Sequence, residues 1–262
     1  MKDPASDSTL VRAVSRALTI LTVMAREESP LGLVAISRLV DLDPTTTHRL
    51  LHTMEAHGFV AQDPADGKYS LGIQAFQIGS SVTHVSVLRQ VSRPFLQTLM
   101  ERTGETANLA IRGGNQVAYV EQVTGTHFLR TVTEVGRSVP LHCTAVGKAL
   151  LMGVDDAEIR QIAGAGLKRY TPNTITSAEA LATEISRCRK QGYTVDMEEF
   201  ESGARCLGAP IMGADGRVFC ALSISGPVTR MPIERIQTLI PMITKSAAEI
   251  TQTLKFANAS FF

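Results

Sequence analysis

The segment LDPTTTHRLLHTMEAHGFV, residues 42–60, constrains the fold most, because it carries the start, the buried face and the end of one helix. Asp43 is a good N-cap, and Pro44 suits the first helical position, where its missing N–H would have no partner anyway. Gly58 is typical of a helix C-terminus. Between these signals, residues recur at helical spacing and predict an inward face made of Thr47, Leu50, Leu51 and Met54.

The segments on either side of this helix predict the domain to which it belongs. Two helices are expected before it, over about 11–27 and 33–40, with Ser29-Pro30 and Gly32 between them. Strand-like runs at 59–62 and 68–71 flank Asp66-Gly67, a strong hairpin signal. The first helix is expected to bury one stripe: Val14, Ala17, Leu18, Leu21 and Met24. Three helices followed by a hairpin predict a winged helix-turn-helix over residues 1–72.

The outer face of the third helix has the side chains that read DNA. A recognition helix presents short polar groups and Arg to base edges in the major groove. The residues expected there are Thr45, Thr46, His48, Arg49 and His52. Phosphate contacts are expected from Arg12, Arg16 and Lys68. Double-stranded operator DNA is therefore the expected partner.

The net charge does not support DNA binding, so other interpretations of the first 72 residues remain open. The whole chain has a net charge of +1, and residues 1–72 carry seven Lys or Arg against nine Asp or Glu. Many DNA-binding domains are visibly basic. The polar face would also fit a small helical domain, or a module that senses a metabolite and uses the winged helix only for dimerisation.

The rest of the chain predicts an α+β domain with a largely antiparallel sheet. Residues 73–103 have a helical pattern with breaks near Ser80-Ser81 and at Pro94, so we expect a linker helix over 73–84 and a second domain over 85–262. Strand-like runs are found at 107–112, 116–123, 128–135, 193–197, 207–212 and 217–224. Further helices are predicted over 145–152, 177–191 and 232–256.

Several classes of protein are disfavoured by what the sequence lacks. The four cysteines form no C-x-x-C pair and have no His cluster at ligand spacing, so neither a metal site nor a cofactor is expected. No apolar run could span a bilayer and no signal-peptide core is recognised, which predicts a cytoplasmic protein without a membrane partner. An enzyme using Cys206 with His142, or Ser223 with a distant base, is an alternative without a supporting motif.

A pocket for a small molecule is predicted in the second domain. Thr144 is a plausible N-cap for the helix that follows, so the backbone N–H groups of Ala145 and Val146 would point out of a positive helix end, which suits a carboxylate. Ser223 and Ser225 alternate on one strand and face the same side. These serines could equally satisfy neighbouring backbone groups, and Asp196 in its polar run DMEEFE could be solvated surface.

The sequence resembles the IclR-type bacterial transcriptional regulators along nearly its whole length. The segments that carry the resemblance include RAVSRALTIL at 12–21, residues 42–60, KYSLG at 68–72, HCTAVGKALLM at 142–152, GYTVDMEEFESGARCLGAPI at 192–211 and ALSISGP at 221–227. The resemblance implies a GAF-like effector-binding domain after the linker helix. It also implies a homodimer, or a dimer of dimers, that regulates catabolic genes as a repressor or an activator.

The resemblance also implies which residues hold the effector, a small carboxylic acid. Matching positions in this chain are Ala145, Val146, Asp196, Ala204, Cys206, Ser223 and Ser225. The chain departs from the pattern of small-acid sensors at Val146, where a smaller residue is usual, which leaves the pocket size and the identity of the acid open. Lys148 follows Gly147 without the rest of a phosphate-binding loop, so we expect a structural role for it.

Overall fold

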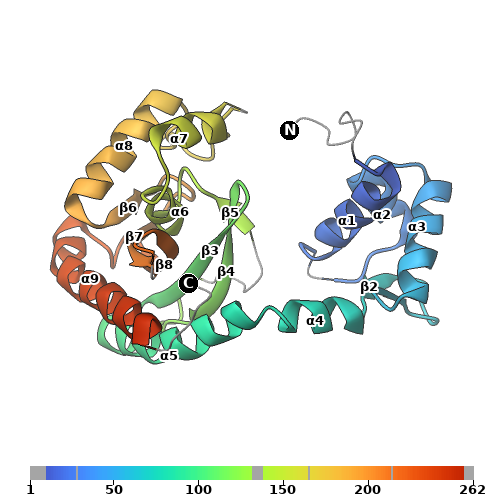
Figure 1. Cartoon of the computed structure of the whole chain (residues 1–262), viewed down its shortest axis with the longest axis horizontal. Coiled ribbons are helices and arrows are strands. Elements are labelled where there is room, and N and C mark those ends of the chain that lie inside the picture. The colour runs from blue at the N-terminus through green and yellow to red at the C-terminus, as the bar shows by residue number, and fades with distance from the viewer. Residues whose placement is uncertain (1–9, 28, 132–137, 165, 214, 257–262) are drawn as a thin grey trace. The chain divides into compact units, whose positions relative to one another are not determined.

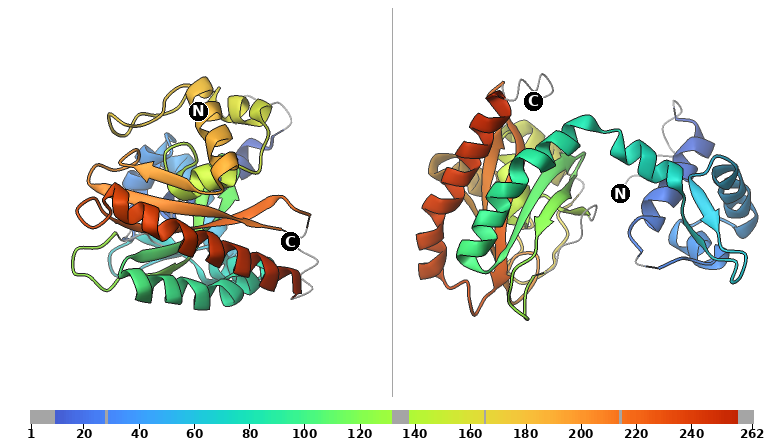
Figure 2. Two further views of the ribbon diagram at one scale, coloured as in Figure 1. Left: turned by 90° about the vertical axis from the view of Figure 1, so that its left-hand side faces the viewer. Right: turned by 90° about the horizontal axis from the view of Figure 1, so that it is seen from below.

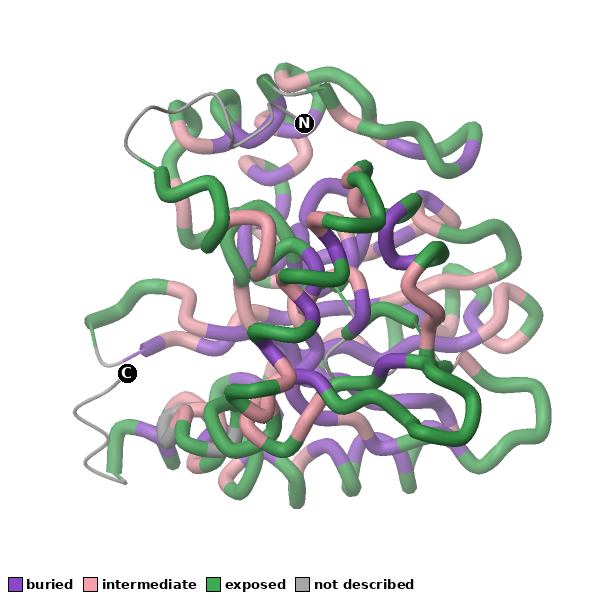
Figure 3. The backbone as a smooth tube through the Cα atoms, turned by 90° about the vertical axis from the view of Figure 1, so that its right-hand side faces the viewer, coloured by how far each residue is buried: buried purple, intermediate pink, exposed green. Residues whose placement is uncertain are grey.

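The computed structural model describes residues 10–27, 29–131, 138–164, 166–213 and 215–256 (Figure 1). The chain forms two compact units, Met1–Thr83 and His84–Phe262. Each unit has a hydrophobic core of its own, and buried positions follow the inward sides of the helices and strands (Figure 3). The two units are therefore described one at a time.

The first unit is a winged helix-turn-helix, as the sequence predicts. Its elements are α1 (Arg12–Met24), α2 (Leu33–Leu39), α3 (Pro44–Ala56), β1 (Val60–Gln62), β2 (Tyr69–Leu71) and α4 (Ile73–Ser80). Strands β1 and β2 pair antiparallel, and Leu31 adds one bridge to Tyr69. Ile20, Ile36 and Leu51 bring one buried side chain from each of the first three helices into the core. This packing fixes α3 by its inner face.

The buried side of α1 differs in part from the predicted stripe. Met24 is buried and Ala17 and Leu21 are partly buried, as predicted, but Val14 and Leu18 are 55% and 58% exposed. Ile20 is fully buried instead. The physical reason is that α1 carries two apolar stripes, and α2 and α3 can cover only one of them. The spacing alone does not say which stripe faces inward.

The second unit is an α+β domain built on one six-stranded sheet. Its elements are α5 (Thr83–Thr103, whose first residue belongs to the first unit), β3 (Thr106–Gly113), β4 (Gln116–Val123), β5 (Ser138–Pro140), α6 (Ala145–Leu151), α7 (Asp156–Ala163), α8 (Ala178–Gln191), β6 (Thr194–Met197), β7 (Ala204–Met212), β8 (Val218–Pro227) and α9 (Ile233–Phe256). The strand order is β5-β4-β3-β8-β7-β6, and every neighbouring pair is antiparallel. The largely antiparallel sheet is thus confirmed.

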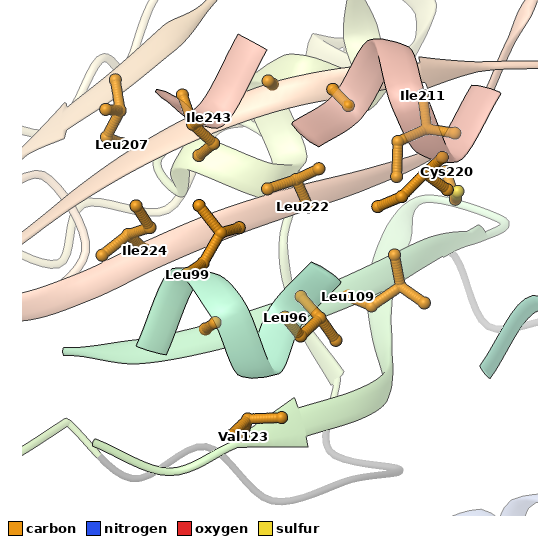
Figure 4. Packing of buried hydrophobic residues seen from close by; sticks show 14 of the residues in the cluster. Leu96, Leu99, Leu109, Val123, Leu207, Ile211, Cys220, Leu222, Ile224 and Ile243 are labelled. Atoms are coloured by element: carbon orange, nitrogen blue, oxygen red, sulfur yellow. The ribbon is translucent and has the colours of Figure 1, made fainter. Parts of the chain in front are cut away.

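The two faces of this sheet have different coverings. Helices α5 and α9 lie side by side on one face (Figure 2), where Leu96, Leu99 and Ile243 meet Leu109 and Leu222 from the strands (Figure 4). Helix α6 packs on the other face, with Leu150 and Leu151 in a second core cluster. Pro94 lies inside α5 and does not break it, contrary to the expected interruption.

One predicted strand is wrong in its described part. Residues 128–131 are irregular, and the rest of the predicted strand at 128–135 lies outside the described residues. Phe128 is fully exposed, so its hydrophobicity in the sequence does not reflect burial in a sheet. Two elements have no counterpart in the sequence-based prediction, the short edge strand β5 and the helix α7.

Candidate functional site

Helix α3 begins at the cap that the sequence predicts. The Asp43 carboxylate accepts a hydrogen bond from the Thr46 backbone N–H at 2.8 Å, and Pro44 occupies the first turn. Hydrogen bonds from the Thr46 side chain and backbone lower the pKa of Asp43. The Thr46 hydroxyl is therefore engaged at the cap, while the rest of the outer face stays exposed: Thr45, His48, Arg49 and His52.

A groove between α1 and α3 brings together six of the eight predicted DNA contacts. They are Arg12, Arg16, Thr46, His48, Arg49 and His52. The other two are Thr45, exposed in the first turn of α3, and Lys68, whose Nζ lies 3.0 Å from an Asp66 carboxylate oxygen in the hairpin. Both members of that ion pair are about half exposed, so the Lys68 ammonium stays accessible to a phosphate.

A buried pocket in the second unit is lined by all eight residues predicted to bind an effector. They are Thr144, Ala145, Val146, Asp196, Ala204, Cys206, Ser223 and Ser225. The cavity has a volume of about 80 Å³, which suits a small organic molecule rather than a single water. Sequence reasoning missed five lining residues: Tyr119, Thr131, Val139, Phe200 and Glu201. Phe200 and Glu201 belong to the same polar run DMEEFE as Asp196, and this proximity was the available signal.

The first turn of α6 lies directly on the sheet and forms one wall of the pocket. The Thr144 side chain accepts the Gly147 N–H at 3.1 Å and donates to the Pro140 carbonyl at 2.8 Å. Gly208 on β7 allows the close approach, because a Cβ there would lie 2.9 Å from the Ala145 carbonyl oxygen. Among the described residues, nothing accepts a hydrogen bond from the amides of Ala145 and Val146.

Two serine hydroxyls in the pocket are oriented by an amide that sequence reasoning missed. Asn108 on β3 is fully buried, and its Nδ2 donates to the Oγ atoms of Ser223 at 3.3 Å and Ser225 at 3.2 Å. The Asn108 Oδ1 accepts from Gln122 Nε2 at 3.1 Å, which fixes the orientation of the amide. Both serine oxygens accept from Asn108, and Ser225 also makes a hydrogen bond to the Cys206 side chain, so the hydroxyl proton that remains to be donated is that of Ser223.

Asp196 is buried in the pocket wall and is not solvated surface. It is 3% exposed, and its Oδ1 accepts the Glu199 backbone N–H at 2.7 Å. Burial raises the pKa of Asp196 to about 7, and the neighbouring Glu199 carboxylate adds to the rise. A buried carboxyl with a raised pKa next to a cavity is typical of functional sites.

Lys148 is a fully buried ion-pair partner behind the pocket. Its Nζ lies 2.5 Å from Glu199 Oε1 and 3.3 Å from Glu184 Oε1. Burial by itself would lower the pKa of Lys148, but these carboxylates raise it above its usual value. Lys148 does not line the pocket, which agrees with the structural role expected for it.

Burial perturbs both residues considered as a nucleophile and base pair, Cys206 and His142. His142 Nε2 lies 3.0 Å from the Lys168 carbonyl oxygen, and burial lowers the pKa of this imidazole. Burial also raises the pKa of the Cys206 thiol, which disfavours the nucleophilic thiolate. Within the described part of the chain, no three His, Cys, Asp or Glu side chains come together as metal ligands.

None of the described helices combines the length and the apolarity that a membrane span requires.

Two sequence families match the chain. The family described as IclR helix-turn-helix domain matches residues 13–64, and the one described as bacterial transcriptional regulator IclR C-terminal matches residues 80–252. The transcriptional repressor IclR of Escherichia coli K12 is 34% identical over 92% of this chain and 89% of its own length. The transcriptional regulator XynR of the same strain is 32% identical over 94% of this chain and 98% of its own length. A crystal structure of an IclR transcriptional regulator from Alicyclobacillus acidocaldarius superposes with a TM-score of 0.80 at 26% identity, covering 94% of this chain and 99% of that one.

Proposed function

Since the chain belongs to the IclR family of DNA-binding transcriptional regulators, we propose that a small carboxylic acid in the pocket beneath α6 controls its affinity for operator DNA. The proposal is supported by one observation above the others. The eight residues predicted from the sequence come from α6 and three strands, and all of them line a single cavity. The chain is a regulator like its relatives and not an enzyme.

The DNA interface we propose is the outer face of α3 with the neighbouring groove and hairpin. Arg49, His48 and Thr45 would meet base edges in the major groove, where donors and short polar groups discriminate sequence. Arg12 and Lys68 would contact phosphates on either side, positioning the helix without specifying sequence. The Thr46 hydroxyl contributes less, because Asp43 already engages it.

The active unit we propose is a homodimer, with pairing of dimers as a further step. Two helices of the first unit expose apolar side chains that a monomer would rarely leave in water. They are Val11, Val14 and Leu18 at the start and along α1, and Ile73 and Phe76 on α4. A second copy would cover these residues and place two recognition helices on a pseudo-palindromic operator.

The carboxylate would lie between the first turn of α6 and the two serines. Within the described residues the amides of Ala145 and Val146 have no hydrogen-bond acceptor, and together with the Ser223 hydroxyl they are donors of the kind that a carboxylate accepts. Binding would shift DNA affinity only by the difference in effector affinity between the free and DNA-bound protein, commonly about 1–3 kcal/mol. The controlled genes would be catabolic genes for that acid. Because the relative from Escherichia coli K12 is named a transcriptional repressor, we propose that this chain represses them.

The test is to measure acid affinity with and without operator DNA. DNA fragments retained by the full chain are selected from the genome of the source organism, and aliphatic and aromatic acids are then screened by thermal shift. A hit should bind with a different dissociation constant when operator is present, and Ser223→Ala should weaken it. Identical constants in both states would rule out control by the acid. A hit that ignores Ser223→Ala would place the acid elsewhere.

A further inference from the structure

The groove between α1 and α3 is basic, although the unit around it is not. Its described lining includes three guanidinium groups and two imidazoles, and no Asp or Glu: Arg12, Arg16, Arg49, His48 and His52. Residues 1–72 as a whole carry seven Lys or Arg against nine Asp or Glu. A surface that gathers cations in this way attracts an anionic partner.

The two imidazoles lie next to each other on the exposed side of α3. His48 and His52 are one helical turn apart, and their rings are parallel, with 6.4 Å between the ring centroids. Three arginines share the groove with them, and within the described residues none of the three has an ion-pair partner. Protonated rings in these surroundings would repel one another and the arginines, and an anion bound in the groove would offset that repulsion.

The elements packed against α3 supply no carboxylate to the groove. Helix α1 contributes only its two arginines as charged lining residues, and α2 and β1 contribute no lining residue. The one charged side chain of α2 is Arg38, and β1 has none. On α3 itself, Glu55 accepts the Gln62 backbone N–H at 3.2 Å, and Asp43 caps the start of the helix.

Proton uptake changes what an imidazole offers to DNA. The neutral ring has one N–H donor and one nitrogen acceptor, whereas the protonated ring has two donors and a positive charge. Phosphate oxygens and the guanine edge in the major groove are acceptors, so they favour the protonated ring. Histidine is the side chain whose charge ordinarily changes between about pH 5 and pH 8. Binding through this pair should therefore depend on pH in the neutral range.

We propose that His48 and His52 take up protons when DNA enters the groove, so that the affinity of the chain for DNA rises as the pH falls. This inference rests on the proposed DNA interface and adds a form of regulation that needs no effector. The arginines keep their charge throughout, so they provide the binding that remains when the rings are neutral. The sign follows from linkage, because lower pH stabilises the state that binds more protons, which is the complex.

The experiment is a fluorescence anisotropy titration of the full chain with labelled double-stranded DNA of unrelated sequence, at pH 6 and pH 8 and fixed ionic strength. The affinity should be about tenfold or more higher at pH 6, since each proton taken up on binding contributes up to about tenfold per pH unit. The slope of log affinity against log salt should also steepen by about 0.9 for each ring that pairs with a phosphate. Equal affinities would overturn the inference and leave DNA binding intact. If no DNA binds at either pH, the proposed interface fails as well.

Paired variants test whether these two residues carry the effect. His48→Gln with His52→Gln cannot take up the protons, so its affinities at pH 6 and pH 8 should no longer differ. His48→Lys with His52→Lys is charged at both pH values and should bind at pH 8 about as tightly as the unsubstituted chain does at pH 6. His57→Gln is the matched control, because this exposed histidine at the end of α3 lies outside the groove and should leave the pH dependence in place.

Melting temperatures at both pH values check that each variant is folded. A pH dependence that survives in the double glutamine variant would assign the protons to other residues and overturn the inference. Its loss in His57→Gln would do the same.

Discussion

At the scale of single residues, Asp196 links the pocket to stability. In the folded chain it keeps its proton up to about pH 7, whereas an unfolded chain loses it near the ordinary value of 3.8. Between these pH values the folded state binds more protons than the unfolded state, so the contribution of Asp196 to the free energy of unfolding falls as the pH rises. This loss of stability, the penalty for ionising a buried carboxyl, is complete above pH 7.

Asp196→Asn removes this penalty. Relative to the unsubstituted chain, we expect the variant to gain on the order of 2 kcal/mol of stability between pH 5 and pH 8. Carboxyls with lowered pKa values, such as Asp156, are present in both proteins and cancel in the comparison. Denaturant unfolding at the two pH values measures the difference. A constant difference would mean that Asp196 ionises normally in the folded state.

Residues that contact bases and residues that contact phosphates should respond differently to a change of DNA sequence and to a change of salt concentration. Arg49→Ala is expected to cost about 1–3 kcal/mol on the selected operator and little on unrelated DNA, because a base contact is lost. Lys68→Ala should weaken both DNAs similarly and reduce the slope of log affinity against log salt by about one. Fluorescence anisotropy over a salt series gives both quantities. A salt-independent interaction would instead favour a module that binds partners other than DNA.

What the sequence predicts at this scale is side-chain chemistry and local geometry. The cap at Asp43 and the alternation of Ser223 and Ser225 follow from neighbouring residues, so they could be anticipated. Asn108 could not, because it lies more than a hundred residues before the serines that it orients, and only the pairing of β3 with β8 brings them together. The burial of Asp196 likewise depends on α6, which packs over that face.

At the scale of elements, the close contact of α6 with the sheet depends on Gly208. We expect Gly208→Ala to destabilise the second unit by about 1–3 kcal/mol, because the new Cβ would lie 2.7 Å from Thr194 Oγ1 and 2.9 Å from the Ala145 carbonyl oxygen. It should also weaken effector binding by moving the first turn of α6. Gly113→Ala is the matched control, since a Cβ there has nothing within 4 Å. Similar unfolding free energies for the two variants would contradict the tight contact.

The exposed apolar stripe of α1 gives a second prediction at this scale. Val14→Ser with Leu18→Ser should shift the chain toward monomer without lowering its melting temperature much, because neither side chain is in the core of its unit. Val34→Ser on α2, which is 54% exposed, serves as the control. Sedimentation over a concentration series measures the association. An unchanged dimer would place the interface on another surface.

The same stripe shows what the sequence pattern of a helix cannot predict. Helical periodicity identifies α1 but not which of its apolar stripes is covered, since that depends on α2 and α3. The edge strand β5 has only three residues, too few for a periodic pattern. Residues 128–131 are apolar in part but take no place in the sheet. The order and type of the longer helices and strands can be predicted from local sequence patterns. A short edge strand such as β5 instead depends on the segments that it contacts in the folded domain.

At the scale of the whole molecule, the two units have separate cores and should respond separately to heat. The helix-turn-helix core around Ile20 and Leu51 shares no residue with the cores on either side of the large sheet. Scanning calorimetry should therefore resolve two transitions. An effector at 100 times its dissociation constant should raise only one of them, by about 2.7 kcal/mol of stability. A single transition that moves as a whole would indicate strong thermodynamic coupling between the units.

The two faces of the large sheet have different roles, because one lines the pocket and the other packs against α5 and α9. Asn108, Ser223 and Cys206 lie on the pocket face, while Leu109 and Leu222, one position along, hold α5 and α9 on the opposite face. A substitution on the pocket face can therefore alter which molecule is recognised without disturbing the packing that keeps the domain folded. After gene duplication, a few substitutions on the pocket face would therefore allow one copy to bind a different metabolite while the fold of the domain stays the same.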